Sequence, residues 1–138
     1  MADTVQKLQY FYIEAPDNPG EGARALETLK GEGVNLVAFS GFPGKGRKAQ
    51  LDFVPADPAA FKQAAKKAKW KVVGPKSCFV IQGEDRVGAL AEHLRKLAAA
   101  KINVTATDAI AAGAGRYGVL LWVKPRDVNR AAKTLGAS

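Results

Sequence analysis

The 138-residue sequence contains one cysteine, one histidine and no long apolar run, and each shortage excludes a class of protein. Cys78 cannot form a disulfide within the chain, and its apolar neighbours favour a small buried residue over a nucleophile. His93 has no second histidine or cysteine with which to share a metal ion, so we expect it at the surface or flank of the fold. No apolar segment approaches the ~20 residues of a membrane-spanning helix. With no signal-peptide pattern at the start, we expect a cytoplasmic protein without cofactor or metal.

Positive charge is in excess, with 21 Lys and Arg against 13 Asp and Glu and a formal net charge of +8. Such a balance is compatible with an anionic partner such as nucleic acid. The densest basic run extends from Lys62 to Lys76. Within it, Lys62, Lys66 and Lys69 recur on one side of a predicted helix, which is the pattern of a solvated face. A solvated face is the default interpretation of these lysines, and nucleic-acid binding by the Lys62–Lys76 surface is our second hypothesis.

The sequence carries an internal repeat, which governs its organisation. Shifted by 68 positions, the chain aligns with itself without a gap over about 27 residues. In this alignment the spacing of the apolar residues and the positions of the polar turn residues are the same in both halves. The matched pairs include Asp17 with Asp85, Gly20 with Gly88, Leu29 with Leu97 and Asn35 with Asn103. We interpret the chain as a duplicated unit, with one copy over residues 1–75 and the other over residues 76–138.

Each copy has the pattern strand, helix, strand, strand, helix, and the first copy adds a fourth strand. In the first copy Asn18 is expected to cap a helix that begins at Pro19 and ends near Gly31. The predicted strands of the first copy are 8–14, 34–40, 49–54 and 70–73, and its second helix ends near residue 69. The prediction is an α+β fold of two ferredoxin-like βαββαβ units in tandem, with antiparallel sheets and helices on one face.

The second copy has no sequence for a fourth strand after its last helix. Its first strand, expected at 78–82, would then lack a neighbour on one side. Because an unpaired edge tends to acquire a strand, we expect the first copy's fourth strand or a second copy of the chain to fill this place.

The turn motifs of both copies resemble those of ACT domains, which are small βαββαβ modules that bind amino acids and regulate metabolic enzymes. The first copy has D-N-P-G at 17–20 and G-V-N-L at 33–36. The second has D-R-V-G at 85–88 and K-I-N-V at 101–104, without the proline or the glycine before the strand. The resemblance covers nearly the whole chain as a tandem pair. It implies a regulatory protein with no catalytic activity of its own, a homodimer or other homo-oligomer, and a possible partner enzyme.

The residues themselves are suited to an amino-acid ligand. A helix N-terminus offers backbone N–H groups to a carboxylate, a glycine lets the ligand approach the backbone, an aspartate complements an ammonium group, and an asparagine supplies donor and acceptors. The ligand-binding residues that we predict from these properties and from the resemblance are Asp17, Asn18, Gly20, Asn35, Asp85, Gly88 and Asn103.

A purely structural interpretation of the same residues stays open. Asn18 and the aspartates are common helix caps, and the two asparagines could tie a helix end to a strand. An enzyme is our third hypothesis, because no nucleophile and base occur together in a recognisable motif.

Overall fold

The computed structural model describes residues 3–138, which form two compact units. The first unit consists of Gln9–Lys76. The second unit consists of residues 3–8 together with Ser77–Ser138, so the start of the chain belongs with its second half. Within residues 3–138, no helix combines the length and the apolar character that crossing a membrane requires.

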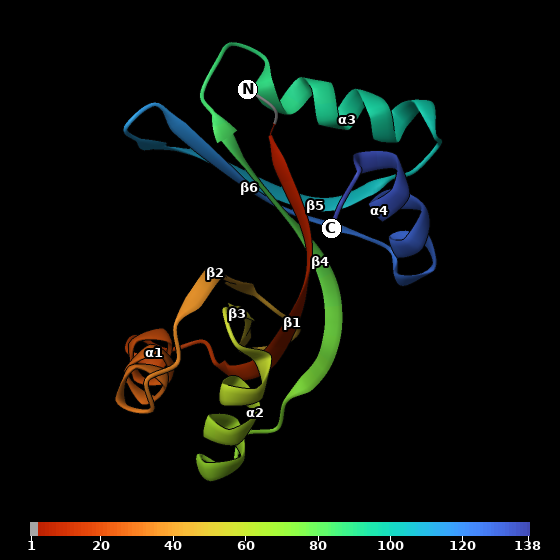
Figure 1. Ribbon diagram of the computed structural model, residues 1–138. Coiled ribbons are helices and arrows are strands. Elements are labelled where there is room, and N and C mark those ends of the chain that lie inside the picture. The colour runs from red at the N-terminus through yellow and green to blue at the C-terminus, as the bar shows by residue number, and fades with distance from the viewer. Residues whose placement is uncertain (1–2) are drawn as a thin grey trace. The chain divides into compact units, whose positions relative to one another are not determined.

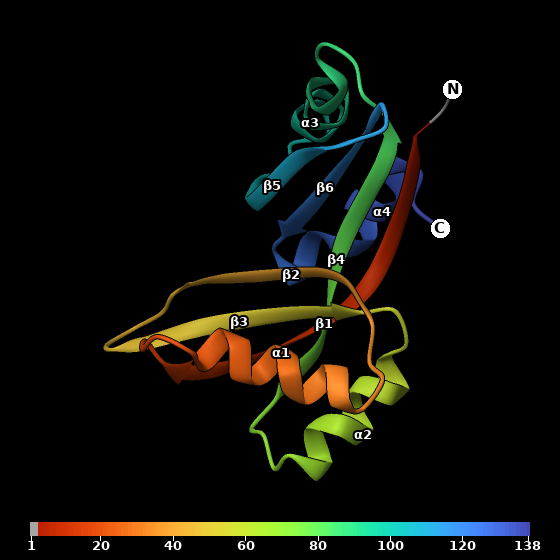
Figure 2. The ribbon, with the colours of Figure 1, turned by 90° about the vertical axis from the view of Figure 1, so that its left-hand side faces the viewer.

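The first unit is a sheet covered by two helices. Its strands have the order β2-β3-β1-β4, and β1 is antiparallel to β3, as β3 is to β2. In Figure 2 the two helices lie together on one side of β1, β2 and β3. The elements in chain order are β1 (Thr4–Pro16, here from Gln9), α1 (Glu21–Gly31), β2 (Leu36–Pro43), β3 (Lys48–Pro55), α2 (Pro58–Lys67) and the start of β4 (Val73–Glu84).

The core of the first unit follows from the two-residue period of its strands. Alternate residues of β1 and β3, including Phe11 and Phe53, face the helices and are almost fully buried. Phe61 of α2 stacks on Phe11 with ring centroids 4.8 Å apart. Each such buried side chain contributes roughly 1.5–3 kcal/mol of transfer free energy. On α1 the buried residues are Ala25 and Leu29, whereas Ala23 and Leu26 are exposed.

The second unit repeats this arrangement, with strand order β1-β4-β6-β5. Its core also lies on one face of the sheet, where Phe79, Val119 and Leu121 meet the buried residues Leu97 and Leu135 of the helices. Its elements are residues 4–8 of β1, β4 from Ser77, α3 (Ala89–Ala99), β5 (Val104–Gly113), β6 (Arg116–Val123), a 3-10 turn (Pro125–Asp127) and α4 (Val128–Leu135).

The backbone repeats with the same spacing as the sequence. The bounds of α1 and α3 differ by the same 68 positions, and so do those of β3 and β6. Hydrogen bonds outside the regular elements repeat as well. The N–H of Val34 donates to Leu29 O at 2.9 Å, and the N–H of Ile102 donates to Leu97 O at 2.9 Å.

Two predictions about the strands are wrong. The strands expected separately at 70–73 and 78–82 are one strand, β4, and Trp70 precedes it. The open side of β4 in the second unit is occupied by the first residues of β1, which Figure 1 shows running alongside β4. Thr4 Oγ1 donates to Gln82 O at 3.3 Å, and Val5 is buried in the second unit's core. β1 can do this because its 13 residues exceed what the first unit uses.

We expect the Val5→Ala substitution to lower the free energy of unfolding by about 2 kcal/mol, because it leaves a cavity in the second unit's core. Urea unfolding followed by circular dichroism measures this change. Gln6→Ala is the matched control, since Gln6 is the next residue on the same strand and is exposed. Equal stability of the two variants would contradict the assignment of this segment to the core.

Candidate functional site

The predicted ligand residues of the first unit lie mainly in the turn that joins β1 to α1. Asp17, Asn18 and Gly20 all belong to this turn and are exposed. The N–H of Asp17 donates to Arg47 O at 2.9 Å. The equivalent turn of the second unit is held in the same way, by the N–H of Asp85 on Gly115 O at 2.8 Å. Both acids are therefore fixed by their backbones.

Neither turn uses a side chain to cap its helix. The residues at the N-cap positions are Gly20 and Gly88, with φ of +92° and +77°, and no side-chain hydrogen bond caps either helix. The expectation that Asn18 and Asp85 act as caps is wrong, because a left-handed glycine takes the position. A Cβ added to Gly20 or Gly88 would have no atom within 4 Å, so both turns are open to solvent.

Beside the turn of the first unit, α1, the end of β1 and the segment that follows α2 line a groove of about 400 Å³, which we call the α1–α2 groove. It extends to Pro16, the residue before Asp17. It carries charges of both signs, because Glu14, Glu21 and Arg24 line it. Arg24 Nη1 donates to both carboxylate oxygens of Glu21 at 2.9 Å, while its side chain stays largely exposed. The groove therefore offers a cation and carboxylates within one small volume.

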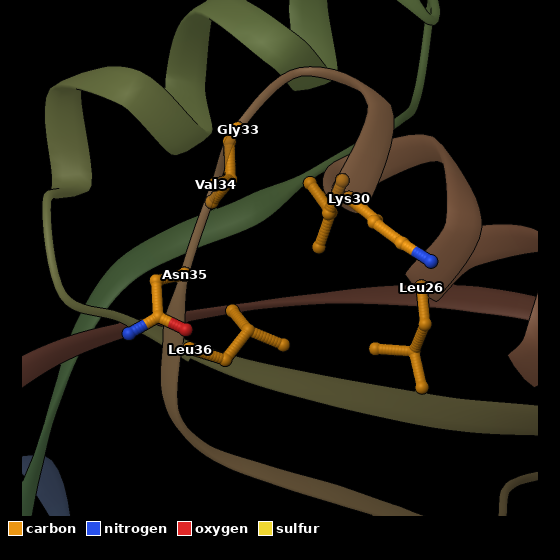
Figure 3. A pocket seen from close by; sticks show the side chains of 7 residues that line it. Leu26, Lys30, Gly33, Val34, Asn35 and Leu36 are labelled. Carbon is orange, nitrogen blue, oxygen red and sulfur yellow. The ribbon is translucent and has the colours of Figure 1, made fainter.

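Asn35 lies in a different hollow, of about 430 Å³, at the other end of α1. Figure 3 shows Leu26 and Lys30 reaching in from α1, while Asn35 and Leu36 come from the segment that follows the helix. The backbone of Asn35 is tied down, since its carbonyl accepts from the N–H of Ala56 at 2.9 Å. Lys30, which sequence reasoning missed, also lines this hollow.

Within a unit, the structure does not bring the turn residues and the asparagine together. The 11 residues of α1 separate Gly20 from the segment that contains Asn35. At 1.5 Å per residue this is about 16 Å, which a free amino acid cannot span. In the second unit α3 separates Gly88 from Asn103 by the same number of residues. Asn103 is exposed after that helix.

Sequence reasoning missed a buried polar cluster at the turn of the second unit. At its centre is the carboxylate of Asp3, only 4% exposed. Arg86 donates to both of its oxygens at 3.1 and 3.2 Å, the Tyr117 hydroxyl donates at 2.5 Å, and His93 Nε2 lies 2.7 Å away. Arg86 also pairs with Glu92 of α3 at 2.7 Å. Because Arg86 is part of the turn that contains Asp85 and Gly88, the cluster fixes this turn.

The contacts within this cluster shift the pKa of Asp3 and the pKa of Tyr117. Burial by itself would raise the pKa of Asp3, but hydrogen bonds from Arg86, Tyr117 and His93 outweigh it and hold that pKa well below its ordinary value. Burial and the hydrogen bond to Asp3 raise the pKa of Tyr117 to about 12. The cluster therefore holds a carboxylate anion and a neutral phenol over the whole physiological range.

The position of His93 corrects a sequence-based expectation, because it is buried with 5% exposure rather than at the surface. Its partner Asp3 is 90 residues away in the sequence, so no local pattern could reveal the contact. A weak signal did exist in the repeat. His93 corresponds to Ala25, which faces the core of the first unit. Cys78, by contrast, is buried as expected.

The lysines of the Lys62–Lys76 surface have different surroundings. Lys67 Nζ pairs with Glu32 at 3.0 Å. Lys62 and Lys76 lie over the rings of Phe11 and Tyr12, at 5.9 and 5.7 Å from the centroids. Several of these cations are thus engaged with the protein itself, and nucleic-acid binding by this surface stays a prediction.

Comparison with known proteins gives a match of structure only, because no family model and no curated protein sequence matches the chain. Protein BT0572 of Bacteroides thetaiotaomicron is similar over 97% of this chain and 88% of its own, with a TM-score of 0.79 and 20% identity. The ligand-free regulatory subunit of aspartate kinase from Thermus thermophilus is similar over 99% and 95%, with a TM-score of 0.65 and 15% identity.

The regulatory subunit of aspartate kinase from Thermus flavus is a further match, over 98% of this chain and 94% of its own, with a TM-score of 0.60 and 18% identity. The chain thus has the α+β fold of these regulatory subunits. The resemblance to ACT domains that the sequence indicated is confirmed at the level of the fold.

We expect the Asp3→Asn substitution to lower the free energy of unfolding at pH 7 by about 3 kcal/mol, because it leaves buried donors without their anion. The pH dependence gives a second readout. Since the pKa of Asp3 is lower in the folded protein than in the unfolded chain, its contribution is complete above about pH 4 and is lost as the pH falls further. Urea unfolding at pH 7 and pH 3 should show a smaller acid-induced loss for the variant than for the natural protein.

The control for this prediction is Asp108→Asn, which changes an exposed carboxylate of the same unit. It should leave both the stability and its pH dependence nearly unchanged. If Asp3→Asn behaved like this control, the cluster would contribute nothing to folding.

Proposed function

We propose that this protein is a regulatory module that binds a free amino acid at the β1–α1 turn of its first unit and in the adjoining α1–α2 groove. The observation that carries the proposal is the start of α1. The helix begins on a left-handed glycine with no capping side chain and no atom above it, and residues of both charges line the groove beside it. Helix caps were the structural alternative for Asn18 and Asp85, and the structure removes it.

The chemistry of a zwitterion matches this place. The ligand carboxylate would accept hydrogen bonds from the free N–H groups of the first turn of α1, where the helix dipole is positive. Arg24 would provide a second, charge-assisted contact to the carboxylate. The ammonium group would be balanced by Asp17 of the turn and by Glu14, which lines the adjoining groove.

The other residues predicted to bind a ligand lie outside the proposed site in the first unit's turn and groove. Asp85 and Gly88 repeat the turn in the second unit, but Glu92 stands there at the position of Arg24. The second turn therefore has no equivalent cation on its helix, and we propose that it binds the ligand more weakly. Asn35 and Asn103 would contact a ligand only at the far ends of α1 and α3.

Regulation is part of the proposal by analogy of fold, because the aspartate kinase neighbours are described as regulatory subunits. A ligand shifts an equilibrium between assemblies by its difference in affinity for them. We propose that ligand binding changes a homodimer of this chain, or its association with a partner enzyme in the cytoplasm, and that the chain itself is not an enzyme.

Thermal melting in the presence of each of the twenty amino acids tests this function. A ligand at about 100 times its dissociation constant should stabilise the protein by ~2.7 kcal/mol, which is a readily measured shift in Tm. Asp17→Asn and Arg24→Gln should each abolish most of this shift, because each removes one charge that the zwitterion needs.

Glu27→Gln is the matched control, since it changes an exposed acid of α1 that does not line the groove. Its shift should equal that of the natural protein. Absence of a shift with every amino acid at millimolar concentration would refute the function, and an equal shift in Asp17→Asn would refute the site.

A further inference from the structure

We propose a second ligand site in the first unit, which binds a small aromatic carboxylate and not a zwitterion. The site is a groove of about 340 Å³ beside α2, which we call the α2 groove. Its lining includes Phe11, Phe61, Lys62, Lys66, Trp70 and Val72. None of the residues predicted from the sequence to bind an amino acid is among its lining residues.

The floor of the α2 groove is aromatic and already ordered. Phe11 and Phe61 are stacked at 4.8 Å, and their side chains are almost fully buried. Trp70 is stacked over Phe53 at 5.8 Å and meets Phe61 at 6.3 Å. Trp70 is only half-buried, so it is the aromatic group that a flat apolar ring in the groove would contact. Because Phe53 and Phe61 hold Trp70 in position, little ordering would accompany binding.

The rim of the α2 groove is positively charged. Lys62 and Lys66 are one helical turn apart on α2, so their side chains project on the same side. Both are exposed, and within residues 3–138 neither ammonium group has an ion-pair partner. No acidic residue lines the groove. Lys62 lies over the Phe11 ring, at 5.9 Å from its centroid, but has no carboxylate partner among residues 3–138. Two such cations above an apolar floor are complementary to a ligand with a ring at one end and a carboxylate at the other.

The same charges disfavour an amino acid in the α2 groove relative to a carboxylate without an ammonium group. An ammonium group on the ligand would face Lys62 and Lys66 with no carboxylate to compensate it. The α1–α2 groove differs in this respect, because Glu14 and Glu21 are present there beside Arg24. The two grooves therefore select for different net charge, and the proposal for the α2 groove does not depend on the proposed amino-acid site.

Isothermal titration calorimetry with four compounds tests the α2 groove. Phenylacetate has both the ring and the anion, phenethylamine has the ring with the opposite charge, phenylalanine has the ring with both charges, and acetate has the anion without the ring. We expect phenylacetate to bind at least tenfold more tightly than phenethylamine or acetate. Phenylalanine, if it binds, should be insensitive to changes of Lys62 and Lys66.

Lys62→Met and Lys66→Met locate the site, since methionine keeps an apolar chain and removes the charge. Each should weaken phenylacetate binding several-fold, and together at least tenfold. Lys67→Met is the matched control, because Lys67 is on the same helix but pairs with Glu32 and does not line the groove. Retention of full phenylacetate affinity in the double variant, or equal binding of acetate, would overturn the proposal.

Discussion

The second unit depends on one strand pairing, in which a neighbouring strand covers the edge of β4. Residues 4–8 of β1 supply the neighbour, and Ser138 then pairs with Val5 and Lys7 of the same segment at 3.1 Å. Because an unpaired edge exposes a row of N–H and C=O groups, the segment removes a surface that would otherwise pair with other chains. Asp3 secures it, with a buried anion that only Arg86, Tyr117 and His93 together can satisfy. The start of the chain is thus a structural part of its second half.

This anchoring explains why two copies of one unit carry different turns. In the second unit Arg86 holds the turn through Asp3, and His93 fills the space beneath α3. At the equivalent positions the first unit has Asn18 and Ala25. Ala25, whose side chain is smaller than that of His93, lines the α1–α2 groove. The turn of the second unit is therefore anchored by a buried polar cluster, whereas the turn of the first unit lies beside a groove that carries both charges.

The sequence was sufficient to predict the 68-residue periodicity, most of the elements and the α+β class, because these depend on local spacing of apolar residues and on turn chemistry that is repeated after 68 positions. It was insufficient for features that arise from contacts distant in sequence. The capping prediction at Asn18 failed because a left-handed glycine two residues later starts the helix equally well. The junction at residues 70–84 was divided into two strands, because Gly74 and Pro75 look like a break when the neighbouring strand is unknown. His93 was misplaced because Asp3 is at the other end of the chain.

Both grooves of the first unit share one wall, through which binding in one groove can change affinity in the other. Trp70 lines the α1–α2 groove and the α2 groove, and it is stacked on Phe53 in the core. A ligand that moves this ring in one groove changes the shape of the other, and the change in affinity must then be the same in both directions. The size of such coupling depends on how firmly Phe53 and Phe61 hold Trp70. A dense aromatic cluster resists small displacements, so a ligand that fits without moving the ring leaves the other groove unaffected. If both grooves bind the ligands that we propose, a ligand that displaces Trp70 would couple the two sites.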